Sequence, residues 1–190
     1  MAQEIIKLVT PVGRCSFPTL KEPKAFGEAS PKYSVQILFD KKTDLSPLKK
    51  AVKAAIENKW GAKVPKKLEL PFKDGNDKED LEGYQDMIFI TASSKFAPTL
   101  FDKNKNQIMD PEDIYAGSYI RASVNVYAWD YVEPTTKKVI KPGVSFTLNA
   151  VQLVKDGEKF SKRGNAVDDF DDLDNDDGSN DESNYDDLGL

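Results

Sequence analysis

The feature that most constrains the fold of this chain is a long segment, residues 119–131, in which two kinds of side chain alternate. A β-strand sends successive side chains to opposite faces, so this alternation predicts a long strand with two chemically different faces. One face is small and aliphatic, as a core requires: Ile120, Ala122, Val124, Val126 and Ala128. The other face carries no aliphatic residue: Tyr119, Arg121, Ser123, Asn125, Tyr127, Trp129 and Tyr131.

The odd-numbered face of this segment suits neither a core nor plain solvent. In a core, Arg121, Ser123 and Asn125 would need buried partners at considerable cost. In solvent, four aromatic side chains in line would form an unusual exposed patch. A surface that binds unpaired nucleic acid explains both the aromatic and the polar residues. Aromatic rings stack on any base, and arginine pairs with phosphate or lies flat on a base. The alternative is that a second layer of protein covers the strand and the rings pack beneath it.

Two further pairs of residues stand at strand ends, where loops around a barrel meet nucleic acid. Lys95 and Phe96 follow a predicted strand at 87–93, and Lys32 with Tyr33 begins another at 33–40. The predicted nucleic-acid-binding set is therefore Tyr119, Arg121, Asn125, Tyr127, Trp129, Tyr131, Lys95, Phe96, Lys32 and Tyr33.

Residues 46–60 are predicted to form the one helix of the chain. Ser46 suits the N-cap, Pro47 the first helical position and Gly61 the C-terminal cap. Apolar residues recur at helical spacing on one face: Leu48, Val52, Ala55, Ile56 and Trp60.

The remaining segments are predicted to be strands, loops and one hairpin. The predicted strands are 4–9, 14–17, 33–40, 87–93, 119–131 and 144–154, with a polar loop at 71–86 and a hairpin tip at 133–138. A single helix between the third and fourth strands is the layout of an OB-fold, so we expect a mainly β, OB-fold-like antiparallel barrel. Periodicity alone also allows a small sandwich.

Charge divides the chain into a basic body and an acidic tail. Residues 168–190 hold eleven acidic and no basic residues, whereas the other 21 acids share residues 1–167 with all 27 lysines and arginines. The body thus carries a net charge of +6 and the tail −11. Because so acidic a segment has too little apolar surface to offset its ordering entropy, we expect a binding domain at 1–163 and a disordered tail at 164–190.

The tail repeats one short pattern, an aromatic residue followed by two aspartates and a leucine. It occurs as Phe170, Asp171, Asp172 and Leu173, and again as Tyr185, Asp186, Asp187 and Leu188. This repetition predicts a short segment that docks on protein partners. Chance repetition in a tract of low complexity is the alternative.

Composition excludes several classes of function. The chain has no histidine, which removes histidine-based triads, histidine general bases and nearly every zinc site, and its single cysteine, Cys15, excludes an internal disulfide. It has no apolar run of the roughly 18 residues that a membrane span needs and no secretion signal, so we expect a cytoplasmic protein without membrane contact. We expect no cofactor, no metal and no enzymatic activity.

Two other functions compete with nucleic-acid binding. A metal-dependent nuclease would use Asp and Glu as ligands, but the densest run of acidic residues lies in the tail, and catalytic carboxylates need a rigid frame. A DNA mimic or protein-interaction module would use the acidic tail as its active part and the barrel as a scaffold.

Three blocks of the sequence resemble the single-stranded-DNA-binding proteins of bacteriophages. They are ITASSKFAPTLFD at 90–102, IYAGSYIRASVNVYAW at 114–129 and GVSFTLNAVQLVKDG at 143–157, and the similarity runs from about residue 4 to 163. The resemblance implies an OB-fold and non-catalytic binding of single-stranded DNA during phage DNA replication and recombination. Many tails of such proteins end in an aromatic residue, whereas this one ends in Leu190, so we expect Tyr185 to take the docking role.

The charge division suggests how body and tail work together. The barrel would bind single-stranded DNA with little sequence preference, and the tail would occupy the basic barrel until DNA displaces it and frees the docking segments for replication or recombination proteins. Binding of duplex DNA or RNA stays open, as does a homodimer against a monomer.

Overall fold

The computed structural model describes residues 5–160, except residues 26, 28, 133, 136 and 138. The described residues belong to one compact unit, Met1–Phe160. The predicted tail at 164–190 and both docking segments lie outside the described residues. No helix in the described part of the chain is long and apolar enough to span a membrane.

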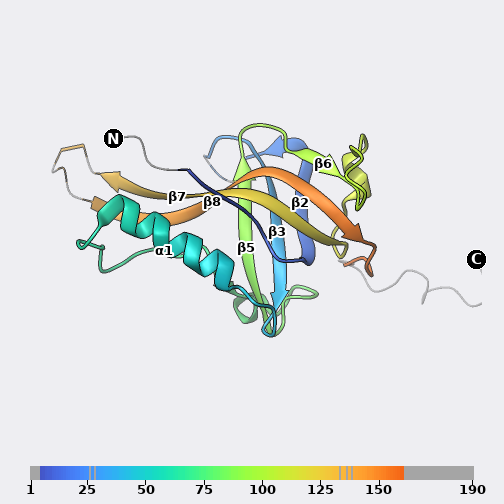
Figure 1. Ribbon diagram of the computed structural model, residues 1–190, viewed down its shortest axis with the longest axis horizontal. Helices are drawn as coiled ribbons and strands as arrows, with labels where there is room; N and C mark the ends of the chain where they lie inside the picture. The colour runs from blue at the N-terminus through green and yellow to red at the C-terminus, as the bar shows by residue number, and fades with distance from the viewer. Residues whose placement is uncertain are drawn as a thin grey trace, which may run out of the picture. The chain divides into compact units, whose positions relative to one another are not determined.

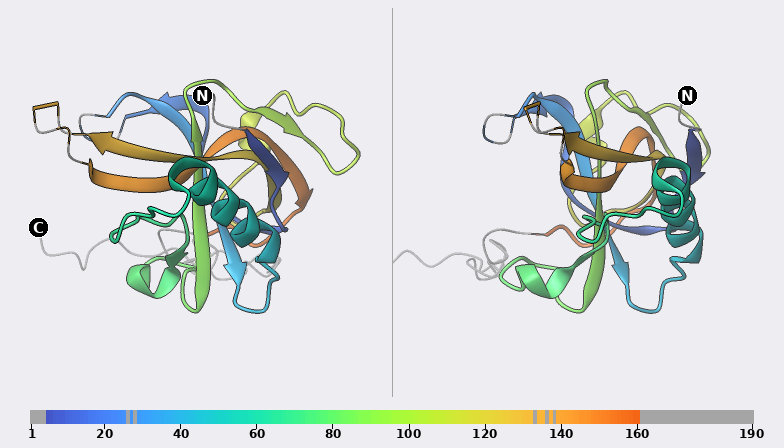
Figure 2. Two further views of the ribbon diagram at one scale, coloured as in Figure 1. Left: turned by 60° about the vertical axis from the view of Figure 1, so that its left-hand side comes forward. Right: turned by 90° about the vertical axis from the view of Figure 1, so that its left-hand side faces the viewer.

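Five strands form a closed barrel, and each pairs with the next in the order β2, β3, β5, β8, β7 and back to β2. The β5–β8 pair is parallel and the other four are antiparallel. Figure 2 shows the same strands from two further directions. A five-stranded barrel of this kind is the OB-fold, so the predicted fold class is confirmed and the sandwich is wrong. The strands are β2 (Gly13–Lys24), β3 (Lys32–Asp40), β5 (Met87–Ser94), β7 (Tyr119–Val132) and β8 (Val139–Lys155).

Shorter elements extend this barrel (Figure 1). Strand β1 (Ile6–Val9) adds an antiparallel edge to β7, and β6 (Thr99–Phe101) runs parallel to the end of β8. Strand β4 (Lys73–Asp74) pairs with β5. Two 3₁₀ helices, η1 (Gly75–Lys78) and η2 (Pro111–Asp113), lie in the connections. Sequence patterns missed β4, β6 and both 3₁₀ helices, because each is too short to show a period.

Helix α1 (Ser46–Trp60) has the predicted bounds and packs against β7, β1 and β8. It lies between β3 and β4, after the third strand of the chain, so its predicted place is confirmed. Because β1 is an edge strand outside the closed ring, the helix follows the second of the five barrel strands.

The predicted N-cap of the helix was wrong, whereas the C-terminal cap is confirmed. Leu45 holds the N-cap position, and the Asp44 carboxylate accepts the Ser46 N–H at 2.9 Å. The hydrogen bonds from Ser46 lower the pKa of Asp44. At the other end, Gly61 has φ +54°, a conformation that favours glycine, and its N–H donates to the Glu57 carbonyl.

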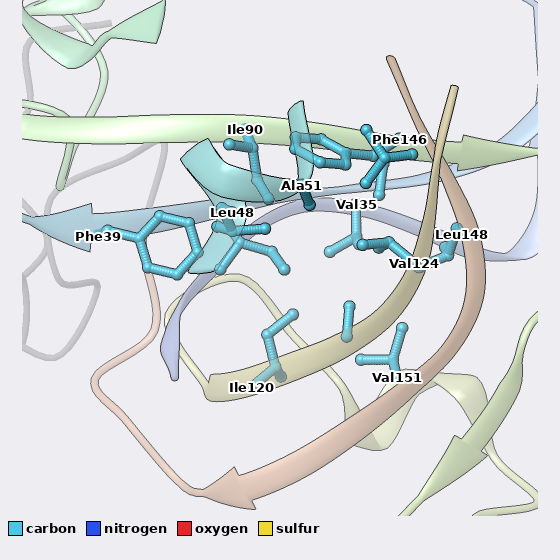
Figure 3. Packing of buried hydrophobic residues seen from close by; sticks show 14 of the residues in the cluster. Val35, Phe39, Leu48, Ala51, Ile90, Ile120, Val124, Phe146, Leu148 and Val151 are labelled. Carbon is cyan, nitrogen blue, oxygen red and sulfur yellow. The ribbon is translucent and has the colours of Figure 1, made fainter. Parts of the chain in front are cut away.

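The core confirms both apolar patterns. All five even-numbered residues from Ile120 to Ala128 are buried, and so are Leu48, Val52 and Ala55 of the helix. Figure 3 shows side chains from the strands and the helix meeting in this core; among those labelled are Val35, Leu48, Ala51, Ile90, Ile120, Val124, Phe146 and Leu148.

A second, smaller cluster lies on the outside of the barrel and is formed by Leu38, Tyr84 and Phe89. Segment 71–86, predicted as a plain polar loop, folds Tyr84 back against β3 and β5, where only 1% of it is exposed. The rings of Tyr84 and Phe89 meet edge-on with centroids 5.3 Å apart. Gly75 permits this fold, because a Cβ there would collide with the Tyr84 carbonyl oxygen. The Tyr84 loop, as we call segment 71–86, therefore covers part of the outer face of the barrel.

Candidate nucleic-acid interface

The odd-numbered residues of β7 point away from the core, as the alternation predicts. Each of them is half-buried or exposed, while every even-numbered residue from Ile120 to Ala128 is buried. Tyr127 is 40% exposed and Tyr131 is 56% exposed, so these two rings are not sealed under a second layer of protein. The two ends of this face nevertheless have different surroundings.

At its first end, Tyr119 packs within the molecule. The Lys155 ammonium lies 4.4 Å from the ring centroid and the Arg14 guanidinium 5.4 Å from it. Arg14 also donates to the carbonyls of Gly117 (3.2 Å) and Glu158 (2.6 Å), which holds segment 155–160 against this end of the strand. Tyr119 is thus engaged by its own neighbours.

Arg121 lies between the two ends and lines a separate pocket of about 380 Å³. Its Nε donates to Gln152 Oε1 at 2.7 Å, and Phe101 and Lys105 line the same pocket. Asn125, further along the strand, accepts a hydrogen bond from Asn149 Nδ2 at 2.9 Å. The polar ends of both predicted residues are therefore positioned by partners on β8.

The second end of the face is open and forms what we call the aromatic pocket, a hollow of about 300 Å³. Tyr127 and Trp129 line it, together with Lys32 of β3 and Thr91 and Ser93 of β5. The fold thus brings together three of the predicted residues, two of them from β7 and one from β3. Tyr131 lies two residues beyond Trp129, opposite Lys141 of β8.

The indole of Trp129 is held in a fixed orientation. Its Nε1 donates to Ser145 Oγ at 2.8 Å. The ring lies directly over Gly143, where a Cβ would come within 2.5 Å of an indole carbon. Gly143 therefore lets the indole lie against the backbone of β8, and Trp129 also lines the aromatic pocket.

Polar side chains continue the interface across the barrel, and the sequence patterns missed them. Strand register places Gln36 beside Thr91 and Ser34 beside Ser93, while Thr91 and Ser93 share the aromatic pocket with Ser145 and Tyr127. Each position was part of a recognised alternation, but Ser, Thr and Gln on a strand do not indicate binding by themselves. Only the register between strands distant in sequence shows that they form one surface.

A second pocket, of about 560 Å³, adjoins the first across β5, and we call it the Phe17 pocket. Thr91 lines both pockets. Phe17, Ser34 and Gln36 line the second, and Lys24 and Lys78 add positive charge to it. Together the two pockets form a hollowed surface that carries hydroxyl, amide and lysine groups, with aromatic residues at both ends.

The remaining predicted residues lie around this surface. Lys95 and Phe96 directly follow β5, and Phe96 is 82% exposed with its N–H donating to Ser94 Oγ at 3.0 Å. Tyr33 alternates with Lys32, so it shares the inward side of β3 with buried Val35 and lies half-buried at the start of that strand. The alternation of 33–40 already predicts that Tyr33 and Lys32 lie on opposite faces of the strand.

The chemistry of this surface is hydrogen bonding, stacking and charge. Within the described residues, no group of three or more Cys, Asp or Glu side chains could hold a metal ion. Burial raises the pKa of the Cys15 thiol to about 12, so it stays protonated in the core. Burial also raises the pKa of Tyr84, whose hydroxyl therefore remains a hydrogen-bond donor at neutral pH.

An OB-barrel whose open face combines aromatic rings, hydroxyl groups and lysines has the features of a nucleic-acid-binding domain. Comparison with known families agrees, since residues 6–181 match the family described as the single-stranded-DNA-binding protein of Enterobacter phage Enc34. The chain belongs to this family, which confirms the resemblance found in the sequence. Protein p50 of Acyrthosiphon pisum secondary endosymbiont phage 1 is 33% identical over 174 residues, covering 84% of this chain and 90% of that protein.

Solved structures share the fold. The single-stranded-DNA-binding protein of bacteriophage Enc34 in complex with single-stranded DNA superposes with a TM-score of 0.65 at 23% identity, covering 82% of this chain and 89% of that one. Protein gp2.5, a single-stranded-DNA-binding protein encoded by bacteriophage T7, gives a TM-score of 0.52 at 12% identity, covering 92% and 100% of the two chains. At these identities the likeness concerns the fold.

Proposed function

We propose that this chain is a non-catalytic single-stranded-DNA-binding protein that takes part in phage DNA replication and recombination. The observation that carries the proposal is the aromatic pocket, in which Tyr127 and Trp129 of β7 meet Lys32 of β3 above a hydroxyl-lined floor. Family membership supports the same function, because the family is described by a single-stranded-DNA-binding protein.

Binding rests on two physical contributions. Bases stack on Tyr127 and Trp129, and each such platform contributes about 1–3 kcal/mol regardless of which base it meets. Lys32, Lys24 and Lys78 contact phosphates and release counterions, so log K falls with log salt at about −0.7 per contact. Because neither contribution reads a sequence, the affinity depends little on sequence overall.

The other predicted residues take graded roles in this mechanism. Tyr131, Lys95 and Phe96 are exposed beside the two pockets and extend the path of the strand. Arg121 and Asn125 provide polar contacts along β7. Tyr119 supports segment 155–160 instead of stacking a base, because Arg14 and Lys155 already lie against its ring.

The acidic tail competes with DNA in this proposal. The body carries +6 and the tail −11, so a tethered polyanion is available to the basic surface at high effective concentration. DNA displaces it and frees the segments at 170–173 and 185–188 for replication or recombination partners. Deleting residues 168–190 is expected to raise DNA affinity, most at low salt; an unchanged or lower affinity would contradict the competition.

The proposal is tested by titrating labelled oligo-dT of several lengths with the protein at two salt concentrations. We expect tight binding that weakens with salt and a length dependence that gives the number of nucleotides per protein. Duplex DNA and RNA of matched length measure the preference for single-stranded DNA. Incubation of labelled DNA with Mg²⁺ or Mn²⁺ is expected to leave the strand intact. Failure to bind oligo-dT even in dilute buffer would overturn the function, and cleavage would overturn the non-catalytic part.

A further inference from the structure

The Phe17 pocket contains an amide whose orientation is set by a chain of buried hydroxyl groups. Gln36 lines this pocket, and its Oε1 accepts the Tyr84 hydroxyl proton at 2.5 Å. The same hydroxyl contacts Ser16 Oγ at 3.0 Å. A phenol has one proton, and a carbonyl oxygen can only accept, so Tyr84 donates to Gln36 and accepts from Ser16.

This arrangement leaves the NH₂ group of Gln36 as its free polar end. Among the described residues, no hydrogen-bond acceptor is found for Gln36 Nε2, and Oε1 is already taken by Tyr84. Gln36 is half-buried on the outward side of β3, between buried Val35 and Ile37. At this point the Gln36 NH₂ group therefore offers the pocket two hydrogen-bond donors.

The wall of the same pocket carries an aromatic ring on a constrained backbone. Phe17 is 40% exposed and has φ +43°, a left-handed conformation that costs energy for a residue with a Cβ. The conformation occurs where the register of β2 against β3 shifts between Ser16 and Thr19. Its ring centroid lies 6.3 Å from that of Tyr84. The bulge thus turns an aromatic ring toward the pocket that holds the Gln36 amide.

We propose that the Phe17 pocket is a subsite for a single base, in which Phe17 stacks the base and Gln36 favours keto bases over amino bases. Thymine and uracil present O4, and guanine presents O6 and N7, all of which accept from the amide NH₂ group. Cytosine and adenine present an exocyclic NH₂ group there, which would face another donor. Tyr84 acts as a positioning residue through its hydrogen bond to Oε1. The inference rests on the proposed function, because the subsite is part of the same DNA-binding surface.

The test compares oligo-deoxyuridine with oligo-deoxycytidine of equal length, which differ at position 4 and in the proton on N3. We expect the wild-type protein to bind deoxyuridine about three- to tenfold more tightly, the effect of one hydrogen bond gained and one mismatch avoided. Gln36→Met should bring the ratio close to one. Gln36→Glu should reverse it, because a carboxylate offers the base an acceptor in place of donors. A purely structural role of Gln36 would not reverse the preference.

Two further variants keep the test decisive. Gln85→Glu adds the same charge at an exposed position on the neighbouring loop and should weaken both oligonucleotides equally, with the ratio unchanged. Tyr84→Phe releases Oε1, so the ratio should fall toward one while binding to deoxyuridine persists. If Gln36→Glu and Gln36→Met both bind DNA with the wild-type ratio, the subsite is wrong and the proposed function stands. If the wild-type protein binds neither oligonucleotide, the function itself fails.

Discussion

Tyr119 and Trp129 lie on the same outward face of β7, near opposite ends of the strand, and both contact glycine backbone. The Tyr119 ring is contacted by three residues from other segments, which are Arg14, Lys155 and Gly157. Around Trp129, Gly143 supports one side of the ring, and the aromatic pocket opens beside it. An aromatic residue on the same strand face is thus part of the scaffold at one end and lines an open pocket at the other.

Alternation along a strand therefore predicts which face a side chain is on, but it does not predict which other segments pack against that face. The sequence pattern alone predicts that both Tyr119 and Trp129 stack on bases. Segment 155–160, which distinguishes them, is held to the first end by Arg14 through the carbonyls of Gly117 and Glu158. Substitutions at each end of the strand separately test whether the two ends have different roles.

The largest effect is expected from removing both rings of the open end. Replacing Tyr127 and Trp129 together by alanine should weaken oligo-dT binding at least about 30-fold, because each stacking platform contributes about 1–3 kcal/mol. Tyr119→Ala should change the affinity less than about threefold and instead lower the melting temperature. Fluorescence anisotropy and thermal unfolding measure the two quantities. Equal losses of affinity at both ends would remove the distinction between them.

A smaller effect is expected from the glycines that support the two rings. Gly143→Ala places a Cβ within 2.5 Å of the Trp129 ring, so the indole must move and DNA affinity should fall about fivefold. Gly157→Ala is the matched change at the other end, where the Cβ would collide with the Gly117 carbonyl. It should reduce stability by about 1–3 kcal/mol and leave affinity nearly unchanged. Chemical denaturation and oligo-dT titration of both variants separate the effects, and the opposite pattern would refute this assignment.

A single lysine at the open end should alter the salt dependence. Lys32→Gln removes one phosphate contact beside Tyr127 and Trp129, so the slope of log K against log salt should decrease by about 0.7. Lys53→Gln is the control, because Lys53 is exposed on α1 and forms an ion pair with Glu57 at 3.8 Å. Titrations at four salt concentrations give both slopes. A decrease of similar size in the control would mean that only total charge matters.

The smallest effect is expected from pH. The chain has no histidine, and burial raises the pKa of Tyr84 above its usual value, so the hydroxyl that orients Gln36 stays protonated well above neutral pH. Affinity for oligo-dT should therefore be constant between pH 6 and pH 9, within about a factor of two. A marked change near pH 7 would require a titrating group that the described surface does not contain.

The sequence predicts those parts of the molecule that depend on local periodicity. The alternation of 119–131 gives the directions of the side chains along this part of β7, and Pro47, Gly61 and the apolar spacing of 46–60 give the bounds of α1. The first 3₁₀ turn and the Tyr84 loop are not predictable in this way, because Tyr84 is placed by contacts with Ser16 and Gln36, both distant in sequence.

The candidate site is predicted only in part for the same reason. Tyr127, Trp129 and Lys32 are polar or aromatic residues on strands and can be recognised from their pattern. Their meeting in one pocket depends on the β3–β5–β8–β7 register, which no local pattern contains. Phe17 was not among the predicted residues, because its position in the second pocket comes from a bulge with a positive φ.

The stacking role of Trp129 can be measured directly, because the chain has only two tryptophans. The second, Trp60, ends α1 and packs against the core, so Trp60→Phe leaves Trp129 as the only indole. Titrating this variant with oligo-dT while recording both tryptophan fluorescence and the anisotropy of a label on the DNA tests the account. We expect the fluorescence of Trp129 to be quenched in parallel with binding and to saturate at the same protein-to-DNA ratio. Unchanged fluorescence while the anisotropy reports full binding would contradict the account, because the DNA would then lie elsewhere on the protein.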